Sequence, residues 1–267
     1  MTTARAARIA RTGGPDVIEW SDVDLPLPGE GEVLVGTRAV GLNYIDTYFR
    51  TGLYPAELPT GLGSEWVGVV EAAGPGVELK PGDRVGSFGP TRGAYATARV
   101  LPARELITLP DDVDDRTAAA LLLKGCTTEF LVERCARVTA GQNVLVYAAA
   151  GVSVVFDGVG KAMWETSLAV TARRGLIVSF GNAGGAVTGV NLGVLASRGS
   201  LFVSRPTLFD YYVTPEERRA GTERLFAMLR QGAIRPDIGQ TFALEDAADA
   251  HRALEAGETR GSTILLP

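Results

Sequence analysis

The sequence is poor in the residues that build metal centres and disulfide frameworks. Its 267 residues include two Cys and one His. These are too few for a structural zinc set, for a site built on several imidazoles, or for a network of disulfides. We therefore expect a reducing, cytoplasmic setting and no metal site.

Long apolar runs and blocks of like charge are also missing. The longest nearly apolar run, 144–156, contains Gly151 and Ser153 and is shorter than the roughly 20 residues that a membrane-crossing helix needs. The net charge is −5 and is spread along the chain, which argues against nucleic acid and membrane surfaces as partners. The expected partner is a small molecule or a second copy of the chain.

The remaining composition is that of a globular protein with two kinds of region. Apolar residues make up 46% of the chain, enough for the core of one large domain or two modest ones. Up to about residue 110, short β-branched runs separated by Gly and Pro indicate a β-rich domain, and beyond it strands alternate with helices, as in a parallel sheet. The expected strands are 1–11, 32–40, 65–73, 83–88, 94–100, 143–149, 152–157, 175–180, 200–204 and 262–266. The expected helices are 118–123, 127–138, 164–171, 214–232 and 247–257.

The helix signal is strongest in the segment TPEE. Thr214 is suited to be the N-cap, Pro215 falls in the first turn, and Glu217 occupies the capping-box position. Gly232 and Gly257 follow the last apolar positions of two helical patterns. Both glycines are expected to end their helices.

Several blocks of sequence are specific enough to indicate a family. They are GLNYIDTYFRTGLYP (41–55), LPTGLGSEWVGVV (58–70), LLLKGCTT (121–128), VVFDGVGKAMWETSL (154–168), RRGLIVSFGNAGGAVTGVNL (173–192) and GSLFVSRP (199–206). Through them the chain resembles the zinc-independent quinone oxidoreductases, the zeta-crystallin-like branch of the medium-chain dehydrogenase/reductase superfamily.

The resemblance implies an α/β fold of two domains. A GroES-like β-rich catalytic domain would comprise 1–124 with 245–267, and a Rossmann doubly wound parallel sheet domain, truncated here, would comprise 125–244 and hold NADPH. The implied activity is hydride transfer to a quinone or a related enone. The implied assembly is a homodimer.

Zinc-dependent relatives carry a metal-binding His in a Gly-His-Glu triplet, where this chain has Gly-Ser-Glu at 63–65. The single His251 falls in the expected C-terminal helix, so a catalytic metal is not expected. Developing negative charge on the acceptor must then meet fixed donors. The resemblance places Tyr48 and Arg205 in the substrate cleft, as the catalytic candidates.

The resemblance also implies a set of cofactor-binding residues. Asn43 and Thr127 would lie near the nicotinamide ribose or amide, and residues 180–182 beside the nicotinamide ring. The full set is Asn43, Thr127, Gly151, Phe180, Gly181, Asn182, Arg205 and Arg260.

Each of these residues also has an ordinary structural interpretation. Tyr48 could be a core aromatic residue, and Asn43 a turn former. Arg205 and Arg260 could be surface charges, and the glycine-rich segment 181–185 a flexible loop.

One part of the pattern departs from a dinucleotide-binding fold. Such a fold needs a Gly-rich turn from its first strand into a helix, whose N-terminal amides hold the pyrophosphate, and an adjacent strand that reads the ribose. AAAG at 148–151 begins this motif, but VSVVFD at 152–157, which resembles the family's fourth strand, follows at once. Roughly sixty residues, two βαβ steps of about 30 each, are absent. Losing two or three phosphate contacts would weaken cofactor binding by about 10² to 10⁶.

The short connection creates a topological conflict. In the family the first and fourth strands are parallel neighbours, which need a crossover of about a dozen residues, whereas about three are present here. We therefore expect that these strands pair antiparallel, that they form one bent strand, or that the natural polypeptide contains a stretch missing from this sequence; the last is favoured. If the chain is contiguous, an inactive homologue acting as a dimeric structural or binding protein becomes the better interpretation.

Overall fold

The computed structural model describes residues 2–89, 91–146 and 151–267. The chain packs as two compact units: unit 1 is Met1–Cys126 with Thr214–Pro267, and unit 2 is Thr127–Val213. The domain bounds given above differ from these units over 214–244 and stay a prediction. Residues 148–150 of the AAAG motif lie outside the described residues.

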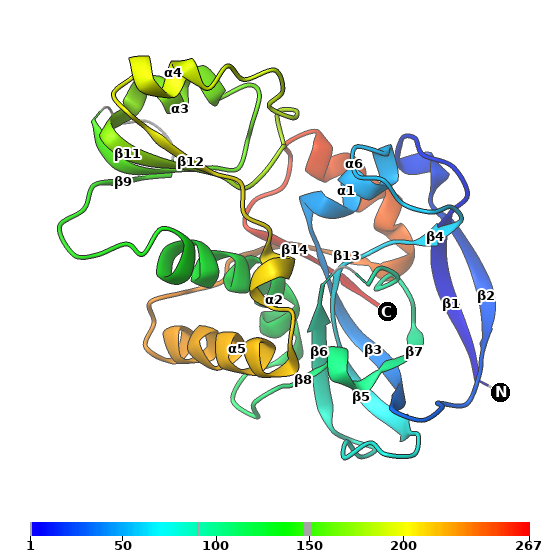
Figure 1. Ribbon diagram of the computed structural model, residues 1–267. Helices are drawn as coiled ribbons and strands as arrows, with labels where there is room; N and C mark the ends of the chain where they lie inside the picture. The colour runs from blue at the N-terminus through cyan, green and yellow to red at the C-terminus, as the bar shows by residue number, and fades with distance from the viewer. Residues whose placement is uncertain (1, 90, 147–150) are drawn as a thin grey trace. The chain divides into compact units, whose positions relative to one another are not determined.

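Unit 1 is built on two β-sheets (Figure 1). The smaller has the strand order β2-β1-β4, and the larger β13-β14-β3-β5-β6-β8, with β7 also pairing β3. All pairs are antiparallel except β13 with β14. The strands are β1 (Thr2–Ile9), β2 (Glu19–Leu25), β3 (Glu32–Leu42), β4 (Thr60–Gly61), β5 (Glu65–Ala73), β6 (Arg84–Phe88), β7 (Ala98–Pro102), β8 (Ile107–Thr108), β13 (Ile238–Ala243) and β14 (Ser262–Leu266).

The core of unit 1 joins distant parts of the sequence. Val35, Trp66 and Leu265 pack in one cluster of buried side chains with Leu244 and Ala250. Strands near the start of the chain therefore share a core with its last helix and strand. Burying apolar side chains of this size contributes about 1.5 to 3 kcal/mol each.

The helices of unit 1 follow their local signals. At α5, the Thr214 hydroxyl accepts a hydrogen bond from the Glu217 amide at 3.2 Å, and the Glu217 carboxylate accepts one from the Thr214 amide at 3.0 Å. This confirms the capping box. The α-helices are α1 (Tyr44–Thr51), α2 (Asp115–Glu129), α5 (Pro215–Arg230) and α6 (Ala247–Glu255), and the 3₁₀ turns are η1 (Pro15–Val17), η2 (Ala103–Glu105) and η5 (Leu244–Asp246). In the described part of the chain, no helix combines the length and apolar character that crossing a membrane requires.

Unit 2 contains a four-stranded sheet with the order β12-β11-β10-β9, in which every pair is parallel. Trp164, Leu168 and Val194, from two helices, pack on Val155 and Ile177 of the sheet, so both helices cover the same face (Figure 1). The elements are η3, a π-helical turn (Phe130–Cys135), β9 (Val144–Leu145), β10 (Val152–Asp157), α3 (Trp164–Val170), β11 (Thr171–Ser179), α4 (Gly193–Ser197), β12 (Phe202–Ser204) and η4 (Leu208–Tyr211). The expected parallel sheet is confirmed.

The strands β9 and β10 correct one expectation. They are parallel neighbours, although a connection this short was expected to exclude that arrangement. The pairing is limited to Val144 with Val154 and Leu145 with Val155. After β9 the chain therefore has to travel back along only a few residues of strand, at about 3.3 Å per residue, before β10 begins. Residues 146–151 have the length for that, because a chain reaches about 3.3 Å per residue. The antiparallel pair and the single bent strand are both wrong.

Candidate active site

The carboxyl edge of the sheet in unit 2 carries two loops that are bonded to each other. One loop follows β10 and the other follows β11. The amide of Phe180 donates to the Asp157 carbonyl at 2.8 Å, that of Gly184 to the Val159 carbonyl at 2.7 Å, and that of Lys161 to the Gly185 carbonyl at 2.8 Å. Open parallel sheets bind ligands beyond the carboxyl ends of their strands, so this edge is the candidate site of unit 2.

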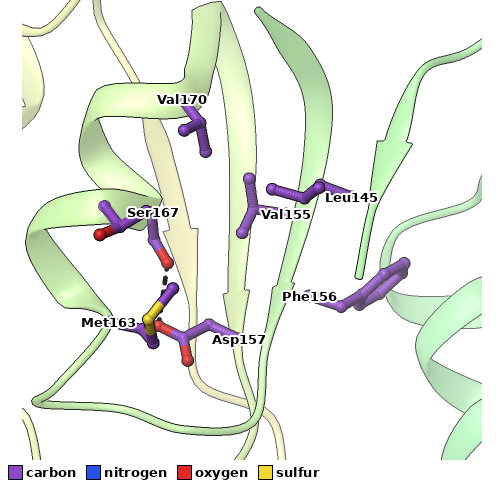
Figure 2. A pocket seen from close by; sticks show the side chains of 8 residues that line it. Leu145, Val155, Phe156, Asp157, Met163, Ser167 and Val170 are labelled. Carbon is purple, nitrogen blue, oxygen red and sulfur yellow. Dashed lines mark hydrogen bonds between the residues drawn. The ribbon is translucent and has the colours of Figure 1, made fainter. Parts of the chain in front are cut away.

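Asp157 holds the first of these loops in shape. Its buried carboxylate accepts hydrogen bonds from the amides of Val159 and Gly160, both at 2.9 Å. It also accepts one from the Ser167 hydroxyl at 3.0 Å (Figure 2). These bonds close the turn after β10 and tie it to α3. We therefore assign Asp157 a structural role in the loop.

A pocket between α3 and the sheet lies beside this carboxylate (Figure 2). Most of its lining is apolar, and the carboxylate and hydroxyl that face it are bonded to each other. It therefore offers few polar groups to orient a ligand. Its lining residues are Leu145, Val155, Phe156, Asp157, Met163, Thr166, Ser167 and Val170.

The close approach of the two loops depends on glycine. A Cβ atom at Gly181 would lie 2.2 Å from the carbonyl oxygen of Gly158, a distance that side chains do not tolerate. A Cβ at Gly158 would in turn lie 3.0 Å from the Phe180 ring. The expected nicotinamide residues, Phe180, Gly181 and Asn182, thus belong to a loop fixed by contact with its neighbour rather than to a loose glycine-rich linker.

Arg205 belongs to the same edge. It follows β12, is exposed, and its Nη1 donates to the carbonyl of Ser179 at 2.7 Å. The structure therefore brings Arg205 to the end of β11, where residues 180–182 begin. Gly151 is placed elsewhere, because it precedes β10 and its amide donates to the Val170 carbonyl at 2.7 Å. Thr127 is half-buried on α2.

In unit 1, Asn43 lies in a buried polar cluster around the start of α1. Its side-chain amide donates to a Glu65 carboxylate oxygen at 2.8 Å and to the Gly41 carbonyl at 3.2 Å, and its backbone amide donates to Asp46 at 3.0 Å. Both amide hydrogens of the side chain are therefore engaged inside the protein, which favours the role of turn former.

Glu65 is fully buried and accepts donors from three directions. Besides Asn43, the Leu123 amide donates to its carboxylate at 2.7 Å, and the Lys124 ammonium lies 3.8 Å away. Burial raises the pKa of Glu65, while Lys124, Asn43 and Leu123 oppose that rise. This carboxylate links β5 to α2.

A second buried chain of hydrogen bonds runs from Arg50 to Asp46. The Arg50 Nε donates to Nδ1 of His251 at 3.2 Å, so the imidazole proton is on Nε2, which donates to the Tyr95 oxygen at 2.9 Å. The Tyr95 hydroxyl donates to Asp46 at 3.3 Å, and the Ser64 hydroxyl donates to the other Asp46 oxygen at 2.9 Å. The chain connects α1, α6 and the segment before β7.

Burial governs the protonation of Asp46 and His251 in this series of hydrogen bonds. It raises the pKa of Asp46 to about 6, partly offset by hydrogen bonds from Asn43 and Ser64. Burial, with the Arg50 charge, lowers the pKa of His251 to about 3. His251 is therefore neutral at pH 7 and is unsuited to exchange protons with a substrate at that pH.

Tyr48 packs beside other aromatic rings, and Arg260 lies at the surface. Tyr48 is half-buried on α1, with its ring 5.1 Å from that of Tyr54 and 6.2 Å from that of Tyr44. The side chain of Arg260 is 82% exposed and lies 3.5 Å from the Asp237 carboxylate. Their proposed roles therefore stay predictions.

The groups around residues 63–65 do not fit a catalytic zinc. In the described part of the chain, no three His, Cys, Asp or Glu side chains gather where they could hold a metal ion. Ser64 stands where zinc-dependent relatives carry His, and its hydroxyl is committed to Asp46. Both oxygens of Glu65 accept protein donors, and both nitrogens of His251 are bonded. A zinc site needs such atoms as open ligands.

No sequence motif predicted a role for Asp46, Arg50, Tyr95 or Lys124. One signal was available, since Asn43 and Asp46 have the spacing of a capping box and so mark the start of α1. The remaining groups come together only through tertiary packing.

Two family models match the chain: an alcohol dehydrogenase GroES-like domain over residues 29–111 and a zinc-binding dehydrogenase over residues 134–265. A quinone oxidoreductase of Pseudomonas aeruginosa is 42% identical and aligns with 99% of this chain and 100% of its own. The chain belongs to the quinone oxidoreductase family. The family and the GroES-like and Rossmann-like fold expected from the motifs are thereby confirmed.

Two further relatives indicate what the family does. The crystal structure of Escherichia coli quinone oxidoreductase in complex with NADPH superposes with a TM-score of 0.94 at 35% identity, covering the whole of both chains. A 2-haloacrylate reductase of Burkholderia is 32% identical over 98% of each chain. The family therefore includes enzymes named for quinones and for an activated alkene.

The alignment with the P. aeruginosa protein also measures a gap. It has 324 positions, whereas this chain has 267 residues, so at least 57 positions (324 − 267) have no residue in this chain. The number agrees with the roughly sixty residues, or two βαβ steps, expected from the motifs. Their position after Gly151 stays a prediction.

The described residues fit only part of a dinucleotide. The loops and Arg205 at the carboxyl edge of β10, β11 and β12 have the arrangement of a ligand-binding edge. Beyond β9, the described residues provide neither a helix that starts at its carboxyl end nor a further parallel strand. The residues present therefore do not fit the whole of NADPH.

Proposed function

We propose that the chain is a zinc-independent oxidoreductase that transfers a hydride from NADPH to a quinone or a related enone. The observation that carries this proposal is the 42% identity to a quinone oxidoreductase over nearly all of both chains. The NADPH complex of the E. coli relative supports the choice of cofactor.

The buried polar cluster of unit 1 supports zinc independence. The atoms of Ser64, Glu65 and His251 that could ligate a metal are engaged in hydrogen bonds within the protein. Negative charge developing on the acceptor then has to be met by protein donors. We assign this role to the Tyr48 hydroxyl and the Arg205 guanidinium.

The carboxyl edge of unit 2 is proposed to hold the nicotinamide. When bound, the reduced nicotinamide supplies the hydride. The loop of Phe180, Gly181 and Asn182 would fix the ring through its rigid backbone, and Arg205 would bring a positive charge beside it. Asn43 and Thr127 are assigned to the ribose or amide, and Arg260 to the outer edge of the cofactor.

Oxidation of NADPH by a simple benzoquinone tests the proposal, followed as the loss of nicotinamide absorbance. Activity that persists in a metal chelator and is at least about tenfold lower in Tyr48→Phe supports it. Complete absence of NADPH oxidation with benzoquinones and with 2-haloacrylate would overturn it. The two acceptor classes separate quinone from enone reduction.

A second candidate function is that of an inactive homologue acting as a dimeric structural or binding protein. The gap of at least 57 positions favours it, because the missing stretch would carry cofactor contacts. The edge strand β12, with Phe202 61% exposed and Val203 39% exposed, is its candidate dimer surface. Quenching of the protein's fluorescence by micromolar NADPH would exclude this candidate.

A further inference from the structure

We infer that this chain recognises the nicotinamide mononucleotide half of its cofactor and makes no specific contact with the adenosine half. Reduced nicotinamide mononucleotide should then bind nearly as well as NADPH. The chain should not recognise the 2′-phosphate that distinguishes NADPH from NADH. This inference rests on the proposed function and specifies which ligand the site takes.

The described part of the chain lacks the structural elements that would bind the adenosine half of the cofactor. In a doubly wound sheet, the turn after the first strand holds the pyrophosphate on a helix N-terminus, and the end of the adjacent strand reads the ribose. Here six residues, 146–151, connect β9 to β10, too few for a helix and a return to the parallel neighbour. In the described part of the chain β9 is also the last strand on its side of the sheet. The described residues therefore supply neither element.

The structural elements that would bind the nicotinamide half are present. The carboxyl ends of β10, β11 and β12 are adjacent, and three strands at about 4.8 Å spacing span about 10 Å, close to the length of one nucleotide. The loops after β10 and β11 are held together by the backbone bonds and by the glycine contact of Gly181 with Gly158. These elements belong to unit 2 alone and do not require the missing stretch.

The charge at this edge suits a single phosphate. Arg205 is anchored on the Ser179 carbonyl, and a guanidinium is well shaped to bind a phosphate through two parallel hydrogen bonds. Lys161 follows β10 and is exposed. Nicotinamide mononucleotide carries one phosphate, whereas NADPH carries three.

The affinities of this chain for NADPH, NADH and the mononucleotide should differ little. Two or three charge-assisted contacts to the adenosine half and its 2′-phosphate would favour NADPH over the mononucleotide by about 10² to 10⁶ in Kd. Without them the dissociation constants of NADPH, NADH and reduced nicotinamide mononucleotide should agree within about tenfold. All three should fall in the range from high micromolar to millimolar.

Equilibrium titrations of the 267-residue chain with the three nucleotides test this, followed by quenching of tryptophan fluorescence. Dissociation constants within about tenfold of one another support the inference. NADPH binding more than about tenfold tighter than the mononucleotide overturns it and leaves the proposed function standing. No binding of any of the three at about 10 mM overturns both.

A pair of charge variants tests the placement of the phosphate. Arg205→Gln should weaken all three nucleotides by the same factor, about tenfold or more, because they share the half that Arg205 would contact. Arg198→Gln is the matched control, because Arg198 precedes β12 at the other end of the strand and pairs only loosely with Glu165 at 3.9 Å.

Circular dichroism and thermal melting of both variants establish that they remain folded. A loss confined to NADPH, or equal effects of Arg205→Gln and Arg198→Gln, would overturn the assignment. Because the readout is binding, the result does not depend on an acceptor being found.

Discussion

The polar cluster of unit 1 and the carboxyl edge of the sheet in unit 2 differ in how their charged groups are placed. In unit 1, Asp46, Glu65 and His251 are almost completely buried, and their bonds are made within the protein. In unit 2, Arg205 and Lys161 are exposed at the edge of a sheet whose loops are held mainly by backbone bonds. A buried polar group fixes one arrangement of the chain, because leaving it unpaired is costly. An exposed charged group can instead be reached by a ligand.

The strongest test of this contrast breaks the buried chain. Arg50→Met leaves His251, Glu255 and the Gly13 carbonyl without their donor. Glu255 is 36% exposed and can be solvated, but leaving the His251 nitrogen and the Gly13 carbonyl unpaired costs about 1 to 3 kcal/mol each in the free energy of unfolding, which urea denaturation measures. Arg252→Met is the control, since Arg252 makes its ion pairs at the surface of the same helix that carries His251. Equal losses in the two variants would contradict the contrast.

Titration of stability with pH separates Asp46 from His251. The pKa of Asp46 is raised to about 6, so the folded chain binds more protons than the unfolded chain between about pH 4 and 6. The contribution of Asp46 to the free energy of unfolding therefore falls as pH rises through this range. The pKa of His251, lowered to about 3, makes its contribution rise with pH between about 3 and 6.5.

Relative to the wild type, Asp46→Asn should therefore gain stability from pH 4 to 6, by about 1.4 kcal/mol per pH unit, and His251→Gln should lose about as much. Urea denaturation at several pH values measures both slopes. Parallel curves for the two variants and the wild type would show that neither group has the shifted pKa.

A glycine substitution tests the rigidity of the edge in unit 2. In Gly181→Ala, the new methyl group meets the Gly158 carbonyl, and relieving that overlap should cost about 1 to 3 kcal/mol of stability. Nicotinamide nucleotides should bind about tenfold more weakly, because the two loops must separate. Gly193→Ala, at the start of α4, is the control and should leave binding unchanged. Unaltered binding in Gly181→Ala would mean that the loop contact does not shape the site.

The smallest expected effect on stability concerns the edge strand β12. Val203→Lys should change the free energy of unfolding by about 0.5 kcal/mol or less, because the side chain is partly exposed. A charge there should nevertheless block pairing between strands of two copies, giving a monomer by light scattering. Val213→Lys, 65% exposed and outside any strand, serves as the control. A dimer that persists in Val203→Lys would place the interface elsewhere.

Local signals predicted the main elements of the fold well. The strands 65–73, 152–157 and 262–266 have the predicted bounds, and α5 begins at its capping box. The prediction missed α1, although Ile45, Tyr48 and Phe49 recur at helical spacing and Asn43 with Asp46 forms a capping box at its start. It also missed β2, β13 and α4, and the two-residue strands β4 and β8, which exist only through their partners.

The candidate site was predictable only in part. Residues 180–182 and Arg205 come from separate motifs, and the structure brings them to one sheet edge. The chain of Arg50, Tyr95 and His251 could not be predicted, because its members are separated by up to 201 positions and share no local pattern. The parallel pairing of β9 with β10 was excluded because a full-length ladder was assumed.

Only two residue pairs join β9 to β10, so the parallel sheet should not open with equal difficulty along its width. Ile177 and Val178 are bridged by β10 on one side and β12 on the other, so their amide hydrogens should exchange with deuterium only when the whole unit unfolds. Leu145 is held by two pairs at a single border, and its amide should exchange through local fraying at far lower energy. The sheet should therefore unfold first at β9, while the end of β11, which residues 180–182 follow, stays folded.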